Sequence, residues 1–277
     1  MHRDRMKRYR FPTNLVQGIS AFIQNSYFFV FKGINLYQGN LKSILCPSLN
    51  CYSCPLAITS CPIGALQHFA ILRILPFYII GFLGSIGAVF GRAQCGWICP
   101  FGFIQDLIYI RRKRTIKLPD FLKYTKYLIL IIMIPLSMIM LEPFFCQFIC
   151  PSGTLLAGIP QVLMVKELRN IVGFLYWWKI SILILIIFLS LLIKRFFCRF
   201  LCPLGAFYSL FNRFSFYQIK VDKEKCTKCN MCEKICPVDI KIYEDEKNPE
   251  CVRCNKCIRV CPFNAIGTGV SHKPTTM

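Results

Sequence analysis

The residues of this sequence best suited to chemistry are its 18 cysteines, most of which recur at fixed short spacings. Two runs near the C-terminus have the pattern Cys-x2-Cys-x2-Cys-x3-Cys-Pro. In two-cluster bacterial ferredoxins the fourth cysteine of each such run binds the other cluster. Structural zinc also uses paired Cys-x2-Cys units, but zinc explains neither the third cysteine nor the prolines. The spacing therefore predicts two [4Fe–4S] clusters, one on Cys226, Cys229, Cys232 and Cys261 and one on Cys251, Cys254, Cys257 and Cys236.

A second pattern, Cys-Pro-x-Gly followed by apolar residues, occurs four times, at Cys61, Cys99, Cys150 and Cys202. Three copies have another cysteine four residues earlier, and in the first copy Ala57 holds that place. Proline suits the first position of a helix, whose positive end would then face an anionic cluster. The alternative is that these cysteines simply pack as small apolar residues. We expect Cys95, Cys99, Cys198 and Cys202 to bind a third cluster.

Six further cysteines form an outer set, which is too many for one cluster and too few for two: Cys46, Cys51, Cys54, Cys61, Cys146 and Cys150. By analogy with the third cluster, we expect Cys61, Cys146 and Cys150 to bind a fourth, with Cys51 or Cys54 as the last ligand. The remaining pair is free to form a disulfide on an oxidising face. An outer loop held entirely by disulfides is the alternative.

The elements that must position these cysteines have the composition of a membrane protein. Hydrophobic residues make up 55% of the chain, and its mean hydropathy is +0.48. About 20 mostly apolar helical residues cross a bilayer. Four segments predict such spans: 14–31, 69–90, 124–141 and 174–193. The predicted fold is a membrane bundle of four helices in residues 1–220, arranged as a duplicated hairpin, followed by a small α+β two-cluster ferredoxin-like domain in 221–277.

Charge sets the expected orientation. The formal net charge is +21, and the Lys and Arg residues flank the apolar segments, which indicates membrane topology and no nucleic-acid partner. Segments 1–14, 91–126 and 194–223 hold 5, 8 and 6 Lys or Arg, whereas 32–68 and 142–173 hold 2 each. Positively charged loops stay in the cytoplasm. We therefore expect a multi-pass protein of the cell membrane, with both termini and the ferredoxin-like domain in the cytoplasm.

Other cofactors are constrained by what the sequence lacks. With only His2, His68 and His272, no histidine pair is available for a b-type haem within the bundle. Clusters at opposite membrane edges would be about 30 Å apart, which is the thickness of the hydrocarbon. Either the cysteine motifs dip into the membrane on re-entrant segments, or a quinone or flavin sits between the helices. We therefore expect the inner and outer motifs to lie closer together than the bilayer is thick.

These motifs together resemble the polyferredoxin-like membrane proteins typified by the NapH-type quinol dehydrogenase subunit of periplasmic nitrate reductase systems. The resemblance rests on four spans, on Cys-x3-Cys-Pro at Cys95/Cys99 and Cys198/Cys202, and on the ferredoxin run at 226–261. It implies electron transfer across or along the membrane, between a cytoplasmic redox partner protein and a quinone or an extracytoplasmic acceptor. The sequence alone leaves open an iron–sulfur redox sensor or assembly factor, and a metal-ion reductase. The cysteine-rich loop at 46–61 departs from the family pattern.

Overall fold

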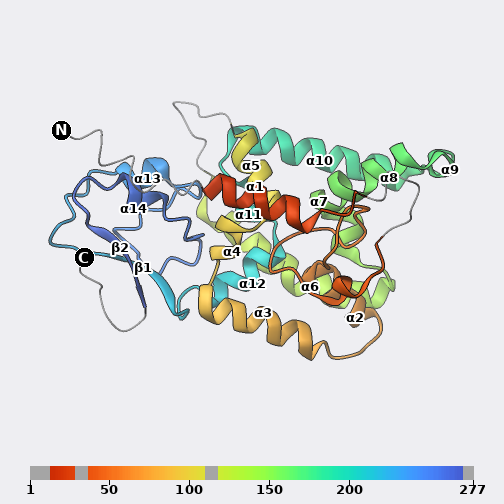
Figure 1. The fold of residues 1–277 in the computed structure, drawn as a ribbon, viewed down its shortest axis with the longest axis horizontal. Coiled ribbons are helices and arrows are strands. Elements are labelled where there is room, and N and C mark those ends of the chain that lie inside the picture. The colour runs from red at the N-terminus through yellow and green to blue at the C-terminus, as the bar shows by residue number, and fades with distance from the viewer. Residues whose placement is uncertain (1–12, 29–36, 110–117, 271–277) are drawn as a thin grey trace.

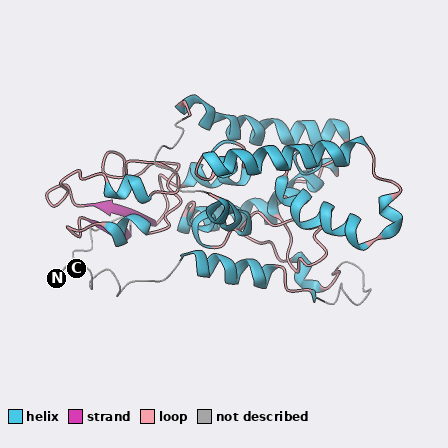
Figure 2. Cartoon of the chain, turned by 90° about the horizontal axis from the view of Figure 1, so that it is seen from above, coloured by secondary structure: helices cyan, strands magenta, loops and turns pink. Residues whose placement is uncertain are grey.

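The computed structural model describes residues 13–28, 37–109 and 118–270. The molecule is elongated, with a small two-stranded unit at one end and the helices extending away from it (Figures 1 and 2). The helices of the larger part are α1 (Thr13–Gln24), α2 (Pro62–Ile71), α3 (Phe77–Phe90), α4 (Ala93–Trp97), α5 (Pro100–Ile108), α6 (Thr125–Met140), α7 (Pro151–Gly153), α8 (Ile159–Met164), α9 (Lys166–Arg169), α10 (Phe174–Leu192), α11 (Phe196–Phe200) and α12 (Pro203–Phe211). Short 3₁₀ turns lie at Asn40–Ser43 and Asp120–Tyr124, and π-helical turns at Phe145–Ile149 and Thr154–Gly158.

Two helices of the described residues, Phe121–Met140 and Phe174–Leu192, are long and apolar enough to cross a membrane. They coincide with two of the predicted spans. The predicted span 69–90 is instead interrupted, since α2 ends at Ile71 and α3 starts after Pro76. Proline ends or kinks a helix because it lacks an N–H and clashes with the preceding turn. The predicted span 14–31 begins as α1, which ends at Gln24, and its last three residues lie outside the described ranges.

The helical part carries its apolar residues outside and many polar residues inside. On α6 and α10 the side chains of Ile139 and Phe174 are 78% and 83% exposed. By contrast, five polar side chains of the helices are almost completely buried: Gln17, Gln67, Gln105, Ser137 and Ser190. Soluble proteins rarely expose extended apolar surfaces of this kind. The distribution is typical of helices that face lipid and hold one another through polar contacts.

Each Cys-Pro-x-Gly motif starts a helix, as the sequence predicts. Cys61, Cys99, Cys150 and Cys202 directly precede α2, α5, α7 and α12, with the proline in the first helical turn. Where a cysteine lies four residues earlier, it belongs to α4, α11 or the π-helical turn Phe145–Ile149. The first copy has no such turn, and Cys51 and Cys54 lie on a loop. All four of these helix starts have a buried cysteine.

The C-terminal unit consists of β1 (Tyr217–Val221), α13 (Met231–Ile235), α14 (Lys256–Val260) and β2 (Ile266–Val270). The two strands are antiparallel, and Tyr217 is opposite Val270 in the register. α13 and α14 each follow a cysteine loop and pack against each other. The first strand begins at Tyr217, a few residues before the predicted boundary at 221.

Buried ion pairs join this unit to the helices. Glu250, directly before Cys251, pairs with Arg92 at 2.7 Å and also with Lys126 of α6. Arg92 and Lys126 are both fully buried. Burial on its own would raise the pKa of Glu250, but the two cations lower it below its ordinary value. A second group joins Asp106 of α5 to Arg195 at 2.7 Å and to Lys256 of α14 at 3.2 Å.

Glu250→Gln should strongly destabilise the attachment of the C-terminal unit, because it leaves two buried cations without their counter-charge. Removing one partner of a buried pair costs roughly 3–5 kcal/mol. The thermal unfolding midpoint of purified protein in detergent should therefore fall clearly. Glu244→Gln is the matched control, since Glu244 pairs with Lys241 at the surface and such pairs contribute about 0–1 kcal/mol. Equal midpoints for the two variants would contradict a structural role for Glu250.

Candidate iron–sulfur centres

The four cysteines of the inner set lie close together in the interior. Cys95 lies on α4 and Cys198 on α11, while Cys99 and Cys202 precede α5 and α12. All four are buried. Burial raises the pKa of Cys99 and of Cys202, and in both cases the nearby thiols of Cys198 and Cys95 raise it further. Four thiols from two distant stretches of the chain therefore share one interior site.

The local geometry explains the spacing of the motif. The backbone N–H of Gly102 donates to Cys99 Sγ, and that of Gly205 donates to Cys202 Sγ, each at 3.4 Å. A Cβ at Gly102 would lie 3.0 Å from the Cys95 carbonyl oxygen, and one at Gly205 would lie 3.2 Å from that of Cys198. The glycine thus lets the turn that carries the first cysteine pack onto the helix start that carries the second. N–H donors at a helix start favour a negatively charged sulfur there.

The outer set surrounds a cavity of 250 Å³. Its lining contains four of the six outer cysteines: Cys51, Cys61, Cys146 and Cys150. Burial raises the pKa of Cys150 to about 12, with Cys51 contributing, and raises that of Cys61 to about 12, with Cys150 contributing. Between the two alternatives for the fourth position, the structure brings Cys51 to the other three and leaves Cys54 out.

Cys46 and Cys54 have other surroundings. The Cys46 thiol donates to Gln24 Oε1 at 3.0 Å and lies 2.9 Å from Ser48 Oγ. Cys54 donates to Asn25 Oδ1 at 3.6 Å. All 18 cysteines carry free thiols, so neither the disulfide between the two remaining outer cysteines nor the fully disulfide-bonded loop is present.

In the C-terminal unit the two cysteine runs cross over. A pocket there is lined by Cys251, Cys254 and Cys257 of the second run together with Cys232 and Cys236 of the first. Burial raises the pKa of Cys236 to about 12, and Cys254 and Cys251 add to this effect. On the other side, burial and the neighbouring Cys226 and Cys229 raise the pKa of Cys232. The Sγ atom of Cys261 accepts a hydrogen bond from the backbone N–H of Ala265 at 3.3 Å.

The residues around the outer cavity fit an iron–sulfur cluster. Four thiols match the ligand requirement of a [4Fe–4S] cluster. Two buried polar side chains of the lining, the amide of Asn50 and the hydroxyl of Ser152, have no hydrogen-bond partner in the protein. Buried polar groups are nearly always paired, so these atoms are available to a bound group. Among the described residues, no three Cys, His, Asp or Glu side chains are placed to hold a single metal ion.

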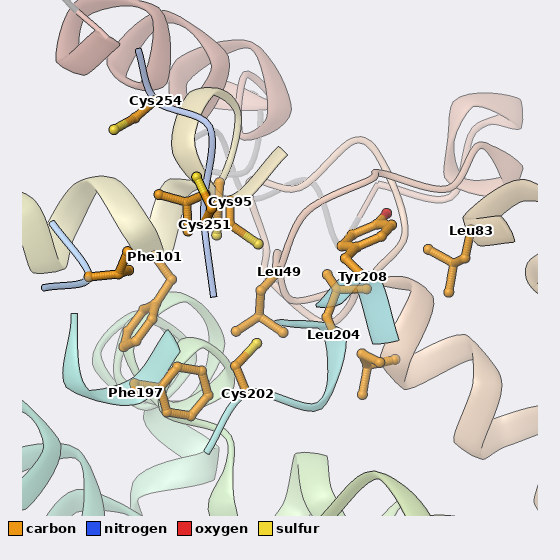
Figure 3. Close-up of a cluster of buried hydrophobic side chains, with 14 of the residues drawn as sticks. Leu49, Leu83, Cys95, Phe101, Phe197, Cys202, Leu204, Tyr208, Cys251 and Cys254 are labelled. Atoms are coloured by element: carbon orange, nitrogen blue, oxygen red, sulfur yellow. The ribbon is translucent and has the colours of Figure 1, made fainter. Parts of the chain in front are cut away.

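The inner and outer sets lie close together. Leu49 lines the outer cavity and lies two residues before Cys51. Its backbone forms a hydrogen bond with Cys99 of the inner set, which lowers the pKa of that thiol and partly offsets the increase caused by burial. Figure 3 shows Leu49 among Cys95, Cys202 and Tyr208. Two residues of extended chain span about 7 Å. The sets are therefore separated by much less than the roughly 30 Å of a bilayer core, as the sequence analysis predicts.

Tyr208 independently shows this proximity. Its hydroxyl donates to the Pro47 carbonyl of the outer loop at 3.1 Å. Burial raises its pKa, and Cys95, Cys46, Cys99 and Cys61 raise it further. A single side chain on α12 thus lies near thiols of both sets.

The inner set in turn touches the C-terminal unit. Trp97 Nε1 donates to the Arg253 carbonyl at 2.9 Å. A Cβ at Gly96, next to Cys95, would lie 2.4 Å from the Val252 carbonyl oxygen and 3.3 Å from Cys254 Cβ. Only glycine allows this approach. The inner set therefore lies between the second ferredoxin run, which it meets at Gly96 and Trp97, and the outer set, which it meets through Leu49 and Tyr208.

Several residues at these sites are not identified by the sequence analysis. Arg92 and Arg195 both lie three residues before the first cysteine of an inner motif. Each donates to the carbonyl of the opposite motif, Arg92 to Cys198 at 3.0 Å and Arg195 to Cys95 at 2.8 Å. Gln67 and Gln105 donate to cysteine sulfurs. The sequence does contain a signal for them: the two arginines lie at the same distance before their motifs, and the two glutamines lie at the same distance after theirs.

Known proteins match the chain in the same regions. A 4Fe-4S binding domain model matches residues 72–119, 126–166 and 175–223, and a second 4Fe-4S binding domain model matches 219–241 and 247–267. The first thus covers three of the Cys-Pro-x-Gly motifs, and the second covers both ferredoxin runs. No solved structure matches significantly.

Three relatives illustrate the extent of the similarity. An uncharacterized protein of Methanocaldococcus jannaschii is 32% identical over 194 residues, covering 66% of this chain and 67% of the relative. Another uncharacterized protein of that organism is 39% identical over 168 residues, covering 56% and 63%. The methylamine utilization ferredoxin-type protein MauN of Methylorubrum extorquens is 28% identical over 178 residues, covering 63% and 54%. The chain thus spans less than two thirds of the last two relatives. With its cysteine sets and these matches, the chain belongs to the family of ferredoxin-type proteins with 4Fe-4S binding domains.

Proposed function

We propose that this protein transfers electrons through a membrane, between a redox partner protein at the C-terminal unit and an acceptor at the outer end. The observation that carries the proposal is the close succession of cysteines from the C-terminal unit, through the inner set, to the outer cavity. A [4Fe–4S] cluster exchanges one electron at a time at a potential set by its surroundings. A quinone or an extracytoplasmic acceptor fits the outer end, and a quinol-linked role like that of NapH-type proteins is part of this proposal.

The proposed ligands are four cysteines per cluster. Two clusters of the C-terminal unit would be held by Cys226, Cys229, Cys232 and Cys261, and by Cys236, Cys251, Cys254 and Cys257. The inner cluster would be held by Cys95, Cys99, Cys198 and Cys202, and the outer one by Cys51, Cys61, Cys146 and Cys150. The first domain would then provide two clusters and the second, from about residue 221, two more.

A membrane location is supported by the exposed apolar surfaces of α6 and α10. We propose that α1 and α3 accompany them in the bilayer as the shorter members of a four-helix bundle. The cysteine helices would be re-entrant, which a membrane tolerates where irregular backbone is covered by protein. The unequal distribution of Lys and Arg supports cytoplasmic termini and a cytoplasmic C-terminal unit.

The ligand assignment is tested by iron content. Anaerobically purified protein should contain about 16 iron atoms per chain, with equal labile sulfide, for four [4Fe–4S] clusters. Cys51→Ser should remove about four of them, because Cys51 lines the outer cavity. Cys54→Ser is the matched control and should retain the full complement, since Cys54 lies on the same loop but outside the cavity. Zinc in place of iron, or equal iron loss in both variants, would overturn the assignment.

The electron-transfer function is tested in liposomes. Purified protein is reconstituted into vesicles that enclose ferricyanide, and dithionite is added outside. Each protein molecule should reduce many molecules of the enclosed ferricyanide, and rapidly. In vesicles with the Cys51→Ser variant, the rate of ferricyanide reduction should be that of protein-free vesicles. A single brief reduction of the clusters without turnover would instead favour a redox sensor.

A further inference from the structure

Two buried glutamines make the same pair of hydrogen bonds at the two membrane-domain sites. Gln105 Nε2 donates to Cys198 Sγ at 3.0 Å, and its Oε1 accepts the backbone N–H of Phe197 at 3.1 Å. Gln67 Nε2 donates to Cys146 Sγ at 3.2 Å, and its Oε1 accepts the backbone N–H of Phe145 at 2.8 Å. In both cases the amide bridges a cysteine and the residue just before it.

The correspondence extends to position. Gln67 and Gln105 each lie six residues after the cysteine that precedes their helix, α2 or α5. Each reaches across to the first cysteine of the other motif at its site. The corresponding positions of the other two motifs hold Leu156 and Tyr208, so each site receives one such amide. Gln67 and Gln105 are at most 1% exposed.

The orientation of both amides is fixed by chemistry. A backbone N–H can only donate, so the amide oxygen must face Phe197 or Phe145. The amide nitrogen must then face the sulfur, because the two atoms occupy opposite sides of one planar group. Gln67 Oε1 also lies 3.2 Å from Ser137 Oγ, which donates to it. The N–H···S contacts are therefore determined by the packing around them.

We propose that Gln67 and Gln105 are equivalent positioning residues that set the reduction potentials of the outer and inner clusters. This inference rests on the proposed assignment of clusters to these two sites. An N–H donor stabilises negative charge on sulfur, and it does so strongly in a low-dielectric interior. Reduction adds negative charge to the cluster, so the contact favours the reduced form and raises the potential. Each glutamine acts on one site only.

The test is a redox titration of purified protein with full iron content. Gln67→Met and Gln105→Met replace each amide by an unbranched side chain of similar size without an N–H donor. Gln105→Met should shift the midpoint potential of the inner cluster to a more negative value and leave the outer one unchanged. Gln67→Met should do the reverse, so each variant is the control for the other. The two signals are identified by their absence from Cys99→Ser and Cys51→Ser.

A second variant separates tuning from folding. Gln105→Leu also removes the nitrogen donor and adds no other donor, and the inner potential should again become more negative. Unchanged potentials in the iron-replete Met variants would overturn the proposal. Loss of the inner cluster from both Gln105 variants would also overturn it, because the glutamine would then serve assembly. Full iron in Cys99→Ser and Cys51→Ser would refute the cluster assignment itself, which is a separate result.

Discussion

Under the proposed cluster assignment, negative charge on buried sulfur is the constraint on which the rest of the structure depends. A cluster bound by four thiolates is an anion, and an anion in an apolar interior is costly unless nearby groups compensate its charge. For the proposed inner cluster the chain would supply this compensation in three forms: helix-start N–H groups, an amide donor and two buried arginines. Arg92 and Arg195 cannot lose their charge, and each holds the carbonyl of the opposite motif. Their own charge is balanced by Glu250 and Asp106.

This balance also explains how the C-terminal unit is attached. Glu250 adjoins Cys251, and Lys256, which pairs with Asp106, adjoins Cys257. The groups that offset charge at the inner site are thus held by the loops that carry the neighbouring cysteines. The contacts that hold the unit against the helices therefore also bring Glu250 to Arg92 and Lys256 to Asp106. The short approach of Gly96 to the 252–254 segment follows from the same packing.

Much of this arrangement is predictable from local sequence, and the remainder depends on tertiary structure. The helix starts at the Cys-Pro motifs follow from proline chemistry, and the apolar runs of α6 and α10 follow from composition. The place of Cys51 in the cavity lining, with Cys54 outside it, does not follow from local sequence, because the two cysteines lie three residues apart on one irregular loop. The span expected over 69–90 is broken at Pro76, since a hydropathy pattern records composition and not continuity. From the sequence, Lys126 is expected at the edge of a span. Its ion pair with Glu250 is not predictable locally, because the two residues lie 124 positions apart in the chain.

The central claim is that the outer loop carries its cysteines deep into the bundle, beside the inner set. Two paramagnetic clusters at such a short distance interact magnetically. Electron paramagnetic resonance of the fully reduced protein therefore measures the proximity of the inner and outer clusters most directly. The account predicts that the inner cluster's signal is broadened both by the outer cluster and by the nearest cluster of the C-terminal unit, and that it becomes narrower in Cys51→Ser, which lacks the outer cluster. An inner signal that is identical in the wild-type protein and in Cys51→Ser would contradict it.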